Sequence, residues 1–251
     1  MQVLFSNSAY KMANKNNEKR EDGAYKVILG ALNASNIHGQ FYVASGVKEL
    51  LTTGGYHSIA SKISRGLLKG EGRHPFKLPG MSDSDFVNRN LIVDNVTASH
   101  HIFEVLLEET NEVEANGVKV ILIWGWVKPT DNDLGRALKA DLDDINVNVA
   151  FSIRCFSILK NANGIPTRYI TNIVTWDWVD NPGIARAVKP GTNAPVLTAE
   201  NAMCDIAITI ELLEELKDMN IAVTTENGDN LALISSLVRR VSDEVPIYKK
   251  W

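Results

Sequence analysis

Three short segments of this chain contain side chains of the types that a nucleophilic hydrolase uses. His74 lies in the sequence GEGRHP, Ser152 in AFSIRC and Asp177 in WDWVDNP. A serine hydroxyl becomes an effective nucleophile when a histidine removes its proton, and a carboxylate orients that histidine. The three residues are therefore candidates for nucleophile, base and orienting anion, provided that the fold brings them together.

The serine and the aspartate lie in two consecutive segments with the pattern of β-strands. Residues 146–158 and 168–179 are rich in β-branched and aromatic side chains. The Asn163-Gly164 pair between them is typical of a turn. We therefore expect two strands that the chain can fold into a hairpin.

Alternation along these strands orients the candidate residues. In the first strand, Cys155 points to the same face as the apolar side chains, which leaves Ser152 and Arg154 on the other face. If the two strands pair as a hairpin, Asp177 can lie near Ser152, although the sequence does not determine the register. Because Cys155 faces the core, it is not a candidate nucleophile.

The rest of the chain up to residue 190 supplies the elements that must hold these strands. Strands are predicted at 24–34, 91–97, 101–108 and 117–127, and helices at 45–53, at 57–68 and after the capping sequence Thr130-x-x-Asp133. We find no internal repeat among them.

The composition changes near both ends of the chain. Residues 1–23 are rich in asparagine and charged side chains and predict a mobile N-terminal arm before a folded domain at 24–190. Residues 191–251 are expected to form a helical C-terminal segment. A linker is predicted at 189–195, with helices at about 199–218 and 229–241.

Charge and cysteine content argue against several classes of protein. The formal net charge of −4 does not favour a primary nucleic-acid binder. Two cysteines, Cys155 and Cys204, are too few for a disulfide framework and favour a reducing compartment. The longest apolar run, at 118–127, is too short to span a bilayer, and the first residues lack the pattern of a signal peptide. We therefore expect a soluble intracellular protein.

The sequence predicts no metal site and no cofactor. His100 and His101 are adjacent, so in a strand their side chains face opposite ways and do not readily chelate one ion. The chain also has no Walker-type or dinucleotide-binding glycine loop.

The three segments together resemble a known family. RGLLKGEGRHP resembles the histidine motif of the phage prohead (capsid maturation) proteases of the T4-like type. Ser152-x-Arg154 resembles their serine motif, and Asp177-Trp-Val-x-x-Pro182 resembles their downstream aspartate segment. The likeness covers roughly residues 25–190. It implies a fold similar to that of herpesvirus assemblin, which is α+β with a mostly antiparallel β-barrel core surrounded by helices.

The resemblance implies a serine endopeptidase that cleaves scaffold and capsid precursor proteins during phage head maturation, after acidic residues, and that processes itself. The implied partners are the scaffold or core proteins and the major capsid precursor, inside the assembling prohead in the host cytoplasm. Retention in the virion and a homodimer stay open, and neither a membrane nor a direct nucleic-acid role is implied. Residues 191–251 would then be a removable targeting or zymogen tail, with Glu244 as a candidate self-cleavage point.

The same resemblance assigns His74 as the base and Asp177 as the third member of a triad. Asp180 is an alternative anion, because it lies only three residues further along the chain. His100 and His101 are also alternatives, because the herpesvirus relatives use a histidine as the third member. These alternatives stay open at the level of sequence.

Ser152 is the nucleophile in this assignment, and two arginines are candidates for stabilising the oxyanion or binding substrate. Arg154 shares the face of Ser152, with a structural salt bridge as the competing interpretation, and Arg186 follows the aspartate segment. Where the family usually has a glycine soon after Ser-x-Arg, this chain has Cys155 and Phe156. That departure favours a second hypothesis, a catalytically inactive head or scaffold-associated protein with the protease fold.

Overall fold

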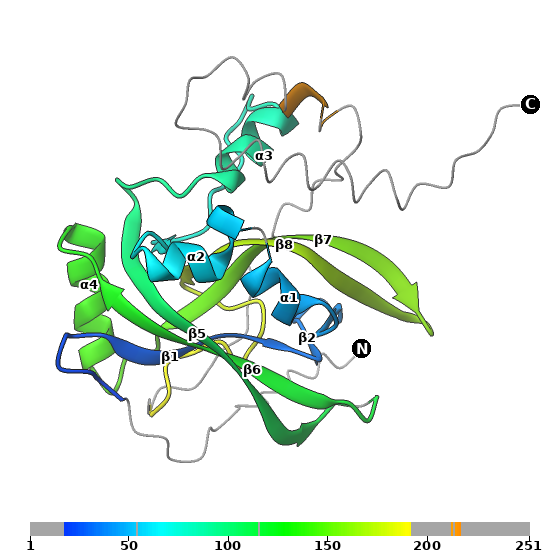
Figure 1. Ribbon diagram of the computed structural model, residues 1–251, viewed down its shortest axis with the longest axis horizontal. Coiled ribbons are helices and arrows are strands. Elements are labelled where there is room, and N and C mark those ends of the chain that lie inside the picture. The colour runs from blue at the N-terminus through cyan, green and yellow to red at the C-terminus, as the bar shows by residue number, and fades with distance from the viewer. Residues whose placement is uncertain (1–17, 54, 115, 192–211, 213, 217–251) are drawn as a thin grey trace, which may run out of the picture.

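Two β-sheets form the body of the protein, and short helices lie around them (Figure 1). The computed structural model describes residues 18–53, 55–114, 116–191, 212 and 214–216. Within these ranges, no helix is long and apolar enough to cross a membrane.

Most elements lie where the sequence pattern predicts them. The strands are β1 Tyr25–Leu32, β2 Ala34–Ser35, β3 Phe41–Val43, β4 Lys69–Glu71, β5 Ala98–Val113, β6 Lys119–Pro129, β7 Ala150–Ala162 and β8 Ile165–Val179. The helices are α1 Val47–Thr52, α2 Ile59–Ser64, α3 Asp83–Leu91 and α4 Asp133–Asp143, with a 3₁₀ turn at Gly55–His57.

Antiparallel pairing dominates both sheets. One sheet has the strand order β1-β6-β5-β4 and the other the order β2-β3-β8-β7. The ladders are antiparallel except the one between β3 and β8, which is parallel. The predicted α+β class with mostly antiparallel strands is therefore confirmed.

β7 and β8 form the long hairpin that carries two of the candidate residues. Asn163 and Gly164 have φ angles of 53° and 85°, the left-handed conformations that a two-residue hairpin turn requires. The resulting register places Ser152 directly opposite Asp177. Because directly opposed side chains extend from the same face of a sheet, the two residues are neighbours. The predicted hairpin is confirmed.

The core between the sheets includes side chains from the same hairpin. Phe151 and Trp176 are fully buried members of the main apolar cluster. Each precedes a candidate residue in the sequence, so alternation turns Ser152 and Asp177 to the opposite face. α3 lies over that part of the hairpin (Figure 1).

The strand predicted at 91–97 is wrong, because the apolar run at its start is the end of helix α3. Ser82 caps this helix by accepting a hydrogen bond from the Asp85 N–H. Leu91 is the last helical residue and is buried, and the chain then turns before β5 begins.

The expected β-barrel core is also wrong: the strands of the described residues form two four-stranded sheets that do not close into a barrel. β4 runs beside β8, but the backbone of β4 is hydrogen-bonded to side chains of β8. Thr175 Oγ1 donates to the Lys69 carbonyl. The Glu71 N–H donates to Asp177 Oδ1 at 2.9 Å. Because side chains occupy these backbone groups, β4 itself forms no ladder with β8, and backbone pairing between the two is limited, among the described residues, to an isolated bridge of Gly72 with Trp178 just after β4.

Part of the predicted N-terminal arm lies against the first sheet. The Arg20 guanidinium carbon is 3.9 Å from the centroid of the Trp126 ring, a cation–π contact. The Glu18 carbonyl accepts a hydrogen bond from the Lys26 N–H. Residues 1–17 lie outside the described residues.

The start of the predicted linker is fixed to α4. Lys189 is buried, and its ammonium group donates to the carbonyls of Asp141 and Asp144 at 2.8 and 2.6 Å. Of the predicted C-terminal helices, the structure describes residue 212 and residues 214–216. Glu244 lies outside the described residues.

Gly70 is required where β4 packs against β8. A Cβ at this position would lie 2.0 Å from the Trp176 carbonyl oxygen and 2.5 Å from the His100 ring. We expect Gly70→Ala to lower the free energy of unfolding by about 3 kcal/mol, because β4 must move away. The matched control is Gly72→Ala, whose Cβ would lie 3.4 Å from the Leu134 side chain, an ordinary contact. Denaturant unfolding measures both variants, and equal stabilities would contradict this packing.

Candidate active site

A short hydrogen bond joins His74 to Asp177. The His74 Nδ1 atom lies 2.6 Å from Asp177 Oδ2. Backbone contacts fix the chain just before the histidine: Gly72 forms a bridge with Trp178, and the Arg73 N–H donates to the Trp178 carbonyl at 2.6 Å. Arg73 has a φ of 88°, a left-handed conformation that is uncommon for a residue with a side chain. The backbone therefore holds the histidine beside the aspartate.

Asp177 is fully buried and its carboxylate is well supplied with donors. Arg154 donates from Nε to Oδ2 and from Nη2 to Oδ1, both at 2.8 Å, and the Glu71 N–H donates to Oδ1. Burial by itself raises the pKa of this carboxyl. The hydrogen bond with His74 and the charge of Arg154 outweigh burial, so the pKa of Asp177 falls to about 2.

The ionised aspartate determines which nitrogen of the histidine carries a proton. A carboxylate can only accept hydrogen bonds, so the His74 Nδ1 atom donates to Asp177. In the neutral imidazole, Nε2 is then the acceptor, as a general base requires. This Nε2 atom is shielded from solvent and has no hydrogen-bond partner in the described part of the chain.

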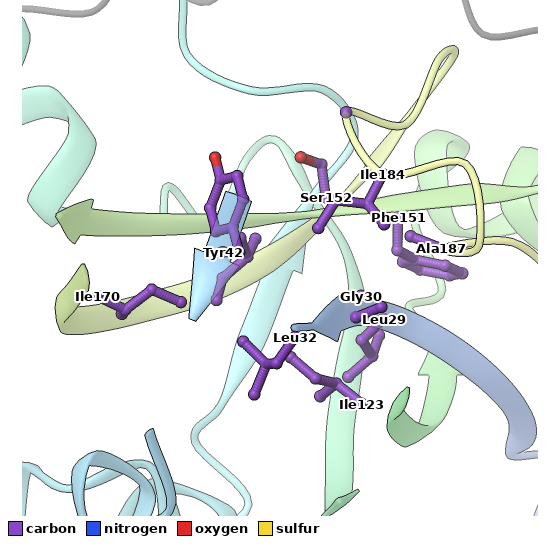
Figure 2. A pocket seen from close by; sticks show the side chains of 13 residues that line it. Leu29, Gly30, Leu32, Tyr42, Ile123, Phe151, Ser152, Ile170, Ile184 and Ala187 are labelled. Carbon is purple, nitrogen blue, oxygen red and sulfur yellow. The ribbon is translucent and has the colours of Figure 1, made fainter. Parts of the chain in front are cut away.

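Ser152 lies on the same face as this pair. It is partly exposed and is the cross-strand partner of Asp177. Figure 2 shows its hydroxyl directed away from the apolar side chains of a small cavity, among them Leu32 and Ile123. The cavity measures about 20 Å³, roughly the space of one water molecule, so it is a gap in the core and not a substrate site.

The two candidate arginines are both placed in ion pairs or hydrogen bonds. Arg154 is buried, and besides the aspartate it binds the Ile92 carbonyl, to which its Nη1 atom donates at 2.8 Å. Arg186 donates to Glu112 and Glu114, each at 3.0 Å, at the end of β5 remote from β4. The contacts of Arg154 agree with the salt-bridge interpretation, and the oxyanion role of either arginine stays a prediction.

Within the described ranges, the alternatives to Asp177 are not bonded to His74. The side chain of Asp180 is 66% exposed and forms an ion pair with Arg73, whose Nε atom lies 3.6 Å from Asp180 Oδ2. His100 and His101 lie on β5. His100 is fully buried, and burial lowers its pKa to about 4, so it is neutral at physiological pH.

Arg89 belongs to the surroundings of the site and was not singled out from the sequence. Its guanidinium donates to both carboxylate oxygens of Glu71, at 3.0 and 2.6 Å. Glu71 also accepts a hydrogen bond from the Asp94 N–H at 2.7 Å. Through these contacts Glu71 ties the turn before the histidine to α3 and to the chain at Asp94. A basic residue in the last turn of a helix capped by Ser82 is the signal that could have found Arg89, but that helix was not predicted.

A histidine bonded to a buried aspartate, with a serine opposite that aspartate on the hairpin, supplies the residue types that a serine hydrolase needs, and comparison with known proteins identifies the family. The Peptidase S80 family model matches residues 5–237. The match covers most of the chain, so this chain belongs to the Peptidase S80 family. The predicted serine peptidase is therefore confirmed, and the match supports a phage prohead protease family. No curated protein and no solved structure matches this chain.

The ionised Asp177 makes part of the stability dependent on pH. Its pKa is about 2 in the folded protein and 3.8 for the unperturbed group, so the stabilisation is present above about pH 4 and is lost as the pH falls towards 2. This difference corresponds to roughly 2 kcal/mol. We expect Asp177→Asn to be less stable than wild type near neutral pH, with a gap that shrinks by about that amount on acidification. Urea unfolding across this range measures the gap, and a gap that is independent of pH would contradict the assignment.

Proposed function

We propose that this serine peptidase is an endopeptidase that cleaves scaffold and capsid precursor proteins during phage head maturation, with Ser152, His74 and Asp177 as its triad. The observation that carries the triad is the 2.6 Å contact between His74 and Asp177, with Ser152 opposite Asp177 in the β7–β8 ladder. The peptidase family supports the chemistry. The motif resemblance at the same residues supports the prohead substrates.

In this mechanism His74 Nε2 removes the proton of the Ser152 hydroxyl, and the serine oxygen attacks the scissile carbonyl. His74 then gives the proton to the leaving amine, and a water molecule activated by the same nitrogen hydrolyses the acyl-enzyme. Asp177 stabilises the imidazolium formed in each step, because its charge lies 2.6 Å from Nδ1. Catalytic hydrogen bonds to a nucleophile are often long in the absence of substrate and shorten when it binds.

The proposal includes cleavage after acidic residues and self-processing. One observation supports a preference for acidic residues: Arg73 precedes His74, and its 79% exposed side chain already pairs with a carboxylate, that of Asp180, at 3.6 Å. Cleavage after Glu244 would shorten the C-terminal segment. The proposed partners are the scaffold or core proteins and the major capsid precursor, in the assembling prohead in the host cytoplasm, and the T4-like type belongs to the same proposal.

A head or scaffold-associated protein without activity is the second candidate. Cys155 and Phe156 follow the serine motif where the resembled family usually has a glycine. In the part of the chain that the structure describes, the Nε2 atom of His74 has no hydrogen-bond partner. The two candidates differ in whether Ser152 attacks a peptide carbonyl.

Ser152→Ala separates the two candidates, because alanine removes the attacking oxygen. We expect the wild-type chain, incubated alone or with its scaffold protein, to be shortened and to shorten the scaffold. Cleavage by Ser152→Ala should fall by about 10³-fold or more. Intact masses measured by mass spectrometry over time report both reactions.

Cys155→Ala is the matched control, since it removes the neighbouring nucleophilic side chain, which packs against the core. We expect this variant to cleave at the wild-type rate. If the wild-type chain and the scaffold both keep their full masses, the inactive candidate is favoured. Cleavage that survives in Ser152→Ala and is lost in Cys155→Ala would contradict the proposed nucleophile.

A further inference from the structure

We propose that Glu71 and Arg89 are positioning residues for the Asp177 carboxylate and act on it through Arg154. The inference rests on the proposed function, because it assigns a role within that catalytic site. Among the described residues, neither the Glu71 nor the Arg89 side chain is hydrogen-bonded to His74. They act on the geometry of the site and not on the substrate.

Arg154 defines the orientation of the aspartate. Its Nε and Nη2 atoms each lie 2.8 Å from a different oxygen of Asp177. A planar guanidinium that binds both oxygens of a carboxylate fixes the plane of that carboxylate. The position of Asp177 Oδ2, the oxygen that binds His74, therefore depends on the position of Arg154.

Glu71 contacts the Nη2 atom of Arg154, which binds Asp177 Oδ1, whereas His74 binds Asp177 Oδ2. The Nη2 atom of Arg154 lies 3.3 Å from Glu71 Oε1, and the two side chains are only 5% and 2% exposed. In surroundings with so little water, charges interact strongly, and removal of one partner leaves the other uncompensated. Arg154 is thus held between two carboxylates, those of Glu71 and Asp177.

Arg89 holds Glu71 in turn. It donates to both Glu71 oxygens, and its Nη1 atom also donates to the Ile92 carbonyl at 3.0 Å. Arg154 donates to the same carbonyl at 2.8 Å. The guanidinium groups of Arg89 and Arg154 therefore both contact the Ile92 carbonyl and the Glu71 carboxylate. These contacts connect the end of α3 to β4 and β7.

The signs of the charges show why the outer pair matters for the chemistry. Charges alternate along the series Arg89, Glu71, Arg154 and Asp177. The negative charge of Glu71 offsets part of the positive potential that Arg154 exerts at the site, so the net potential at the His74 imidazolium is more negative when Glu71 is present. Without Glu71, the Arg154 cation acts on Asp177 alone and opposes the positive charge that forms on the base.

Variants of similar shape test the pair. In Glu71→Gln and Arg89→Gln we expect kcat on a peptide that the wild type cleaves to fall roughly tenfold or more, because a small displacement of a catalytic group has effects of this size. KM should stay within about twofold, because neither side chain meets substrate in this proposal. Arg89→Lys, which keeps the charge beside Glu71, should recover part of the loss.

Arg136→Gln is the matched control. Like Arg89, Arg136 lies on a helix and pairs with a carboxylate, that of Asp133, but both side chains are largely exposed. We expect its kcat and KM to equal those of the wild type. If Glu71→Gln does not fold, Arg89→Gln alone tests the positioning role. The Arg89 side chain is 29% exposed, so its replacement disturbs the core less.

Proton NMR provides a readout that needs no cleavage. The proton on His74 Nδ1, held in a 2.6 Å hydrogen bond, is expected far downfield, and His74→Gln identifies its signal. The signal should move upfield or broaden in Glu71→Gln and Arg89→Gln but not in Arg136→Gln. Folded variants that keep both the wild-type kcat and this signal would overturn the inference. An inactive wild type whose signal still responds to both variants would count against the proposed function and would support the positioning role.

Discussion

The buried contact between Arg154 and Asp177 is the interaction on which the rest of the site depends. A carboxylate without solvent exposure is stable only when its charge is compensated and its oxygens are hydrogen-bonded. Arg154 meets both needs, because it binds each oxygen at 2.8 Å. The aspartate that results is ionised, and its ionisation assigns the proton of His74 to Nδ1 and leaves Nε2 free to act as a base.

The same carboxylate links the chemistry to the architecture. Asp177 accepts the Glu71 N–H, a group that would otherwise be available to a strand ladder between β4 and β8. Where β4 runs beside β8, side chains of β8, and not its backbone, therefore form the hydrogen bonds to the backbone of β4. β4 and β8 therefore belong to different sheets, and charged side chains from β4, β7 and α3 come together where these two strands run side by side.

Local patterns predicted the hairpin well, and tertiary contacts account for what they missed. Alternation and the Asn-Gly turn placed Ser152 near Asp177, because both signals depend on neighbours in sequence. β4 escaped prediction, since Lys69-Gly70-Glu71 has no β-branched or aromatic residue and is held by contacts with distant strands. Arg89 escaped because its helix was not predicted. The role of Arg154 stayed open, because its partners other than Asp177 lie far away in the chain. The prediction of a barrel was wrong because hydrogen bonds from side chains to the backbone of another strand produce no periodic pattern in the sequence.

The length of the β7–β8 hairpin has a consequence for folding. Ser152 and Asp177 face each other near the open end of the ladder, almost as far from the Asn163–Gly164 turn as the pairing extends. In a hairpin that forms from its turn, Ser152 and Asp177 therefore come to lie opposite each other only when the β7–β8 ladder is nearly complete.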